Sequence, residues 1–282
     1  MFDLIAPAGA PTPVIVSVPH AGRAYPDNIA ALLRVPPDKL RALEDRHVDL
    51  IAAQTPGAGA TLIVARTPRA WIDLNRAERD VDPAMIDPPI GLGAGASAKV
   101  RGGLGLVPRR LIGAGDLWRA PLPRAALDER IATIHRPYHA ALAKLLAERQ
   151  ARFGVAVLID LHSMPPIVTQ EGQQPPDIVI GDRFGNSAGD RFTARLRAEC
   201  EAAGLSVAEN SPYAGGHVIE RHGAPGRGIH AVQIEVDRRL YLDAALTEPD
   251  PDGVARMTRI VAALASALAE EALGGSLPIA AE

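Results

Sequence analysis

Short apolar runs alternate with amphipathic stretches along most of this chain. Residues 14–18, 60–65 and 155–161 are apolar or β-branched at almost every position, which predicts strands covered on both faces. Further strands are expected at residues 70–74, 177–181, 205–209 and 230–236. Apolar residues at helical spacing predict helices at residues 36–53, 123–150, 191–203 and 252–273.

Strands that alternate with helices favour an α/β fold with a mostly parallel central sheet flanked by helices. Pro137 interrupts the predicted helix at 123–150 and should kink or split it. Residues 80–106 predict a long irregular loop, and residues 215–228 a glycine-rich one. Because we find no internal repeat and no long linker, we expect residues 1–282 to form a single domain.

Composition narrows the class of protein. The chain has 282 residues, a hydrophobic share of 47%, a charged share of 22% and a formal net charge of −3. These values are typical of a globular enzyme and give no reason to expect nucleic-acid binding. The chain contains no apolar stretch of the roughly 18–20 residues that span a bilayer and no evident signal peptide. The single cysteine, Cys200, excludes an internal disulfide and fits a packing role, so we expect a cytoplasmic protein.

Four of the apolar runs lead to polar side chains that are capable of chemistry. These side chains are His20, Asn75 with Arg76, His162, and Glu235. The carboxyl ends of strands in an open α/β sheet usually form the functional site. We therefore expect these residues to form one site, and two imidazoles beside a carboxylate favour a hydrolytic metal centre.

Among these residues, Glu235 most strongly indicates a functional role. It lies in an apolar run, where burial of an unpaired carboxylate would destabilise the fold. A buried carboxyl group suits a general base, whereas the alternative is a structural ion pair with Arg238 or Arg239. Arg76 could hold a substrate carboxylate or an oxyanion, or it could form a salt bridge with Glu78 or Asp80.

Other polar residues could complete the site. Asp160 precedes His162 by two positions in a strand, so it shares a face with His162 and could fix its tautomer. An acidic metal ligand is expected from the pattern Glu44-Asp-Arg-His-Val-Asp49. His135 and His139 have the i, i+4 spacing of a helical zinc pair but lack its glutamate, which favours a structural role.

Six short motifs, in order, resemble those of the N-formylglutamate amidohydrolases. They are Pro19-His-Ala-Gly-Arg-Ala-Tyr-Pro26, Asp45-Arg-His-Val-Asp49, Asp73-Leu-Asn-Arg76, Asp160-Leu-His-Ser163, Gly215-Gly216 and Gln233-Ile-Glu235. The resemblance covers residues 14–241 and implies a zinc-exopeptidase-like α/β fold that hydrolyses N-formyl or N-acyl amino acids. Related enzymes place an acid three residues after the first histidine, where this chain has Arg23, so our candidate for the acidic ligand is Asp45.

These parts give a hypothesis for the site. His20, Asp45 and His162 would bind a divalent metal. Zinc is the first candidate, and Mn, Fe and Co are alternatives. Glu235 would be the base and Arg76 would stabilise the oxyanion. The substrate-binding residues would be Asn75, Arg76, Arg101, Arg109 and Gly216.

Three functions are compatible with these residues. The first is an N-formylglutamate deformylase of histidine breakdown, and the second is a related amidase for another N-acyl amino acid or small peptide. The third is a catalytically silent protein that binds a metal or ligand. A small-molecule partner is expected in each case, without nucleic acid or membrane, and the sequence does not predict an oligomeric state.

Overall fold

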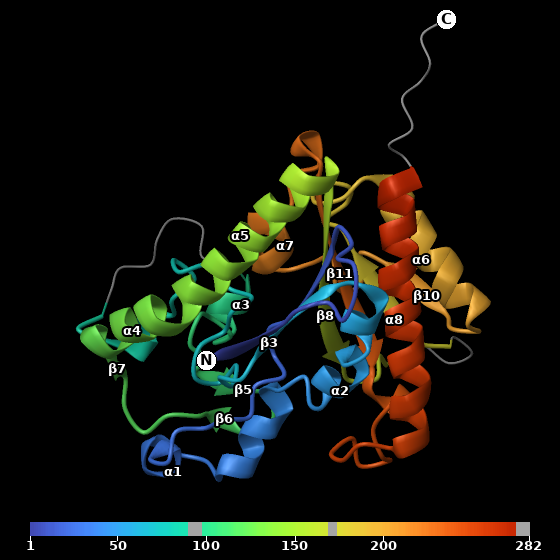
Figure 1. Ribbon diagram of the computed structural model, residues 1–282. Helices are drawn as coiled ribbons and strands as arrows, with labels where there is room; N and C mark the ends of the chain where they lie inside the picture. The colour runs from blue at the N-terminus through green and yellow to red at the C-terminus, as the bar shows by residue number, and fades with distance from the viewer. Residues whose placement is uncertain (90–97, 169–173, 275–282) are drawn as a thin grey trace, which may run out of the picture. The chain divides into compact units, whose positions relative to one another are not determined.

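The protein, described here by a computed structural model, divides into two compact units that interleave along the chain. The structure describes residues 1–89, 98–168 and 174–274 (Figure 1). Unit 1 consists of Met1–Asp3, Pro19–Arg46 and Val64–Ala141. Unit 2 consists of Leu4–Val18, His47–Ile63 and Leu142–Glu282.

A seven-stranded sheet, in the order β1-β3-β2-β8-β11-β9-β10, has its central strands in unit 2. Its strands are β1 (Phe2–Ile5), β2 (Val14–Val18), β3 (Thr61–Ala65), β8 (Ala156–Met164), β9 (Ile178–Gly181), β10 (Val207–Glu209) and β11 (Ile229–Asp237). β8 pairs in parallel with both β2 and β11, whereas β9 is antiparallel to β11 and parallel to β10. β2, β8 and β9 are buried at every position, which explains their apolar sequences.

Helices flank this sheet in unit 2. They are α2 (Val48–Ala52), α6 (Asp190–Ala202), α7 (His217–His222) and α8 (Pro251–Gly274), with the short 3-10 turns η2 (Thr55–Ala58), η5 (Pro225–Arg227) and η6 (Arg238–Leu240). α8 lies beside α6 (Figure 1) and also contacts α2, β2 and β8. Cys200 is buried in α6, and burial raises the pKa of its thiol to about 12, as expected for a packing residue. The predicted α/β fold, with a mostly parallel central sheet flanked by helices, is confirmed.

Unit 1 is built from short elements around an apolar core. Its helices are α1 (Ile29–Leu32), η1 (Pro37–Leu43), η3 (Pro83–Met85), α3 (Ala98–Arg101), α4 (Arg124–Arg130) and the π-helical η4 (Ile131–His135). Its additional strands are β4 (Ile86–Asp87), β5 (Arg110–Leu111), β6 (Gly115–Asp116) and β7 (Leu122–Pro123). Leu33, Ile72 and Leu117 are among the core residues, each no more than 1% exposed.

The helix α5 (Arg136–Phe153) begins in unit 1 and ends in unit 2. The expected interruption near Pro137 is present, because the π-helical η4 stands between α4 and α5. In the part of the chain that the structure describes, no helix is long and apolar enough to cross a bilayer.

One predicted helix and one predicted strand were wrong. The helix predicted at 36–53 is split into η1 and α2, because His47 has a left-handed φ of 59° and the Asp45 N–H donates to the His20 carbonyl. The strand predicted at 70–74 is a turn region, in which the Trp71 N–H donates to the Pro68 carbonyl.

The glycine-rich segment at 215–228, predicted as a loop, contains α7 and η5. Four of its five glycines lie outside these short helices and Gly226 lies within η5, so the glycine content predicted a loop although residues between them are helical. The predicted loop at 80–106 is broken by η3, β4 and α3, and residues 90–97 of that prediction lie outside the described part of the chain.

Candidate functional site

The centre of the unit 2 sheet carries a row of polar residues on one face. Register pairs His162 with Glu235, and pairs Asp160 with Ser17 on one side and Gln233 on the other. Register partners in a parallel ladder, and residues two apart in a strand, point to the same face. All five side chains are buried, since even Glu235 is only 8% exposed. The sheet therefore places a histidine and a carboxylate side by side in a poorly solvated environment.

Asp160 holds His162 in a defined orientation. The Asp160 carboxylate accepts a hydrogen bond from Ser17 Oγ at 2.9 Å and lies 2.9 Å from His162 Nε2. A carboxylate cannot donate, so Nε2 carries the proton and the lone pair of the ring is on Nδ1. The expected contact between Asp160 and His162 is confirmed. In this tautomer, Nδ1 is the ring nitrogen able to bind a metal.

Glu235 is oriented by a chain of hydrogen bonds that begins at the glycine pair. The Gly216 N–H donates to Gln233 Oε1 at 2.8 Å, and Gln233 Nε2 donates to Glu235 Oε1 at 2.8 Å. Gly215 has a φ of +115°, and a Cβ there would lie 2.2 Å from the Ile219 side chain. A residue with a side chain would therefore disturb the turn that aims the Gly216 N–H at Gln233.

The two alternative partners that the sequence suggested for Glu235 both have other contacts. Arg239 Nε donates to Asp237 Oδ2 at 3.0 Å, and Arg238 Nε donates to Ser163 Oγ at 3.2 Å. Arg238 therefore places a cation beside the residue that follows His162 on β8.

In unit 1, His20 lies between two buried carboxylates. Its Nε2 is 2.7 Å from Asp73 Oδ1, and its Nδ1 is 3.4 Å from Asp45 Oδ2. The Asp45 N–H also donates to the His20 carbonyl at 3.0 Å, so the two residues are fixed to each other. When Nε2–H donates to Asp73, Nδ1 and Asp45 Oδ2 are two acceptors that face each other, and a proton or a cation must lie between them. His20 and Asp45 could therefore contribute ligands to a metal ion.

Asp73 is a candidate site residue that the sequence did not single out. Its burial alone would raise the pKa, but Arg69, His20 and Arg76 outweigh that effect and hold the pKa of this carboxyl well below 3.8. Arg69 Nε donates to Asp73 Oδ2 at 2.8 Å. The carboxylate is thus ionised and able to accept the Nε2 proton of His20. The available signal was its position at the head of the motif Asp73-Leu-Asn-Arg76.

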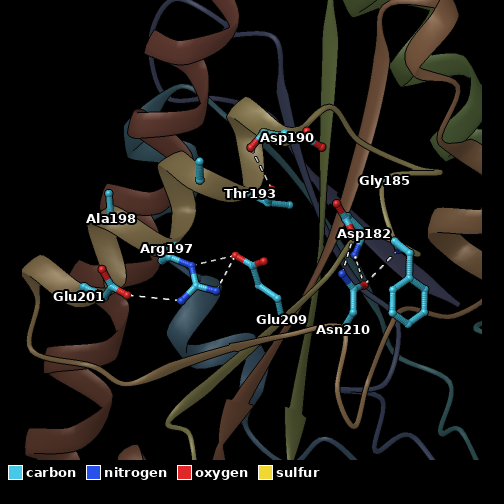
Figure 2. Close-up of a pocket in the computed structure, with 11 residues that line it drawn as sticks. Asp182, Gly185, Asp190, Thr193, Arg197, Ala198, Glu201, Glu209 and Asn210 are labelled. Carbon is cyan, nitrogen blue, oxygen red and sulfur yellow. Dashed lines mark hydrogen bonds and ion pairs between the residues drawn. The ribbon is translucent and has the colours of Figure 1, made fainter.

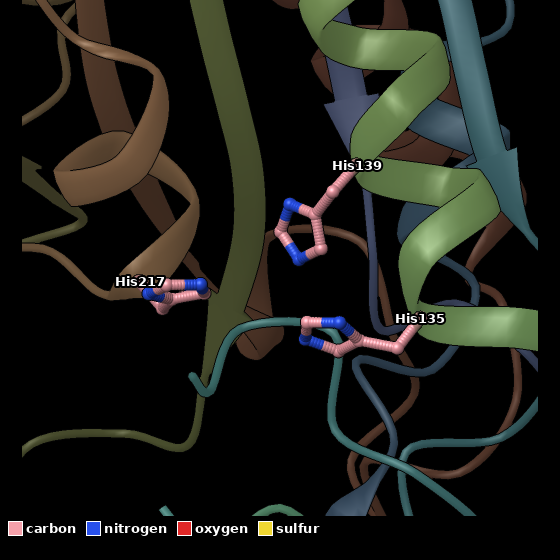
Figure 3. Close-up of side chains that lie close together, drawn as sticks. All are labelled: His135, His139 and His217. Carbon is pink, nitrogen blue, oxygen red and sulfur yellow. The ribbon is translucent and has the colours of Figure 1, made fainter. Parts of the chain in front are cut away.

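His135 and His139 anchor the segment that contains this motif. They lie one turn apart at the junction of η4 and α5 (Figure 3), with ring centroids separated by 4.4 Å. His135 Nε2 is 2.8 Å from the Arg76 carbonyl oxygen, and His139 Nε2 is 3.0 Å from that of Leu74. These bonds support the structural role that the sequence favoured for the pair, since they fix the backbone on both sides of Asn75.

The predicted arginines have different surroundings. Arg76 is buried, and its guanidinium donates to the Leu104 carbonyl at 3.0 Å and to the Asn75 carbonyl at 2.7 Å. Arg109 donates to Asp82 and to Asp116, each at 2.8 Å, and the bond to Asp82 contributes most to raising its pKa. Arg101 is exposed at the end of α3. A role for each of them in substrate binding stays a prediction.

A separate cavity in unit 2 is lined by four acidic residues and, among its described lining residues, one arginine (Figure 2). Arg197 Nε donates to Glu209 at 2.8 Å and lies between that residue and Glu201. Asn210 Nδ2 donates to Asp182 Oδ1 at 2.8 Å. Because these groups satisfy one another, the cavity is a weaker candidate for chemistry than the row on β8 and β11.

Comparison with known proteins identifies the family. Residues 12–242 match the model of the N-formylglutamate amidohydrolase family. The chain belongs to this family. It is 32% identical over 240 residues to an N-formylglutamate deformylase of Pseudomonas aeruginosa, with 82% of each chain covered. A Pseudomonas putida protein of the same name is 31% identical over 244 residues, covering 84% of each chain.

Solved structures support the assignment to the N-formylglutamate amidohydrolase family. The crystal structure of N-formylglutamate amidohydrolase from Ralstonia eutropha matches with a TM-score of 0.89 and 33% identity, covering 97% of this chain and 99% of that one. The gene product Atu2144 of Agrobacterium tumefaciens shares the fold, with a TM-score of 0.69 and 22% identity over 97% of this chain and 95% of its own.

We expect His222, at the end of α7, to make the free energy of unfolding depend on pH. Burial lowers its pKa from 6.5 to about 4, with Arg221 and His217 adding to the effect and Asp160 opposing it. Because the unfolded chain then binds more protons between these values, we expect the free energy of unfolding to fall by up to roughly 3 kcal/mol as pH decreases from 6.5 to 4. In the His222→Gln variant, denaturant unfolding across this range should show a shallower fall.

The matched control for this prediction is Glu220→Gln, which changes an exposed residue of the same helix. It should keep most of the wild-type decrease. An equally steep decrease in wild type and His222→Gln would contradict the assignment of this pH dependence to His222.

Proposed function

We propose that this protein is a metal-dependent amidohydrolase that cleaves N-formyl-L-glutamate into formate and glutamate. The observation that carries the proposal is the register of β8 with β11, which sets a histidine of fixed tautomer opposite an oriented, buried carboxylate. The names of the two Pseudomonas relatives support the choice of substrate. A cytoplasmic place in histidine breakdown is part of the same proposal.

The metal would be held by His20, Asp45 and His162. Zinc ligands lie about 2.0–2.1 Å from the ion, so two ligands of a tetrahedral site are roughly 3.3 Å apart. The separation of 3.4 Å between His20 Nδ1 and Asp45 Oδ2 fits this requirement. Each histidine also has a carboxylate on its Nε2, as is usual for metal-binding histidines. Two imidazoles with one carboxylate suit zinc, and also accept Mn, Fe or Co.

Chain connectivity supports bringing the two histidines into one site. Ser17 pairs with Asp160 in the sheet, so their Cα atoms are roughly 5 Å apart. His20 is three residues beyond Ser17 and can lie no more than about 11 Å from it. His162 is two residues beyond Asp160 on the neighbouring strand. The chain itself therefore limits how far His20 can be from His162, and Asp45 is bonded to His20.

The metal, when bound, would supply a Lewis acid for the formyl carbonyl and for the attacking water. Glu235 would accept the proton of that water and return it to the departing amine, so that the reaction leaves the carboxylate unchanged. Gln233 would hold Glu235 Oε1 in place during both transfers. Asp73 and Asp160 would keep the protons of the two imidazoles on Nε2 throughout.

The substrate carries two carboxylates, so cationic groups should bind them. Arg76, buried next to Asn75, is our first candidate for this role or for stabilising the oxyanion. Arg238, held by Ser163 in unit 2, is a candidate that the structure adds. Arg101 and Arg109 remain candidates from the sequence, with Gly216 as a substrate-contacting residue.

A panel of substrates tests the proposal most completely. We expect hydrolysis of N-formyl-L-glutamate to depend on a divalent metal and to stop on chelation. N-formylaspartate, N-acetylglutamate and N-formylalanine serve as matched comparisons. If one of these were hydrolysed faster than N-formyl-L-glutamate, the protein would be an amidase of the family with a different substrate. Absence of hydrolysis at any metal loading would support a silent binding protein.

Replacement of the base separates catalysis from metal binding. Glu235→Gln keeps the size of the side chain but cannot accept a proton, so we expect kcat to fall by about 10²–10⁴-fold. The metal content measured by atomic spectroscopy should stay at the wild-type level. Glu209→Gln, which changes an exposed carboxylate of unit 2, is the control and should retain activity. Near-normal turnover in Glu235→Gln would exclude this residue as the base.

A further inference from the structure

A small apolar cavity lies in unit 1, separate from the residues discussed above. Its volume is about 260 Å³. The side chains of Leu32, Met85, Val107, Trp118 and Leu122 line it, and Arg130 contributes a charge. Ligand cavities commonly have volumes of about 300–1,000 Å³, so this one suits a ligand at the small end of that range.

Arg130 is unusual among the residues that line this cavity, because an arginine is seldom buried and this one is only 6% exposed. Its guanidinium lies over the Trp71 ring, 3.3 Å from the centroid, and Nη1 donates to the Trp71 carbonyl at 2.9 Å. Guanidinium has five N–H donors, so one backbone bond and one ring face leave most of its hydrogen-bonding capacity for another group.

The structure also shows no acidic partner for Arg130 in the part of the chain that it describes. Within residues 1–89, 98–168 and 174–274, no carboxylate forms an ion pair with it. Burial lowers the pKa of this guanidinium to about 10, and the attraction of Glu129 offsets this only in part. A buried charge without a counter-ion is costly, and a bound anion would remove most of that cost.

A second cation lies at the edge of the cavity. The exposed Arg119 lines it as well, and no acidic residue is among the described residues of the lining. The cavity therefore combines positive charge with an apolar wall. This combination complements a molecule that has one carboxylate and an apolar body.

We propose that this cavity is a binding site for small aliphatic monocarboxylates, with the carboxylate on Arg130 and the hydrocarbon chain against Leu32, Val107 and Trp118. The site differs in chemistry from the one proposed for hydrolysis, because N-formylglutamate carries two carboxylates and little apolar surface. The failure of one proposal would therefore not affect the other.

The protein contains its own reporter for this site. Of its two tryptophans, Trp118 lines the cavity and Trp71 stacks on the guanidinium of Arg130. Their rings pack edge to face with centroids 6.4 Å apart. Intrinsic tryptophan fluorescence should therefore respond to occupation of the cavity.

The experiment is a fluorescence titration of the full-length protein with hexanoate. We expect a saturable change with hexanoate and at least about tenfold weaker binding of its uncharged isostere, hexanamide, since a charge-assisted hydrogen bond is then lost. Glutarate, which places a second charge in the apolar part, should also bind at least about tenfold more weakly. Equal affinities for hexanoate and hexanamide, or no saturable response to hexanoate, would overturn the proposal.

Variants locate the binding in this cavity. Arg130→Gln should weaken hexanoate binding by about tenfold or more, whereas Arg124→Gln, which changes an exposed arginine of the same helix, should not alter it. If Arg130→Gln fails to fold, Leu32→Glu provides a second test, because it adds a negative charge at a residue that is already 38% exposed. It should also weaken binding. Wild-type affinity in a folded Arg130→Gln or Leu32→Glu protein would contradict the assignment.

Discussion

The bond between the buried carboxylate of Asp160 and the ring of His162 is the constraint on which the proposed chemistry depends. Asp160 is fully buried in the middle of a strand that is buried at every position, so its charge needs partners. Ser17 on the neighbouring strand and His162 two residues further along supply them. The ring is thereby fixed in one tautomer. The hydrogen bonds from Ser17 and His162 offset the cost of burying Asp160, and the second of them fixes the orientation of His162.

The same arrangement occurs independently in unit 1. Asp73, kept ionised by Arg69, accepts the Nε2 proton of His20, so the opposite nitrogen points to Asp45. The segment that carries Asp73 is not a strand and has no sheet to fix it. His135 and His139 supply that fixation by bonding its carbonyls. Each imidazole proposed as a ligand thus has a carboxylate behind it, and each carboxylate is held by a different kind of scaffold.

The sequence correctly predicted the buried strands, because burial requires most of their residues to be apolar. The strand containing His162 and the one containing Glu235 are largely buried on both faces, so apolar runs in the sequence predicted both strands. The few polar residues in those runs were therefore recognised as candidates. Asp73 was missed because its proposed role depends on its contact with His20, which lies 53 positions away in the sequence. The helix predicted at 36–53 failed because a tertiary hydrogen bond from Asp45 and a left-handed backbone interrupt it, and neither feature follows from periodicity.

The most direct measurement is nitrogen NMR of the histidine side chains, with and without zinc. In the zinc-loaded protein, we expect both His20 and His162 to be protonated on Nε2 alone, and the Nδ1 signals of both to shift when zinc binds. His230, whose Nδ1 accepts a hydrogen bond from the Gly189 N–H at 3.2 Å, provides an internal reference that should not shift. A proton on Nδ1 of either His20 or His162 in the zinc-loaded protein would contradict the account.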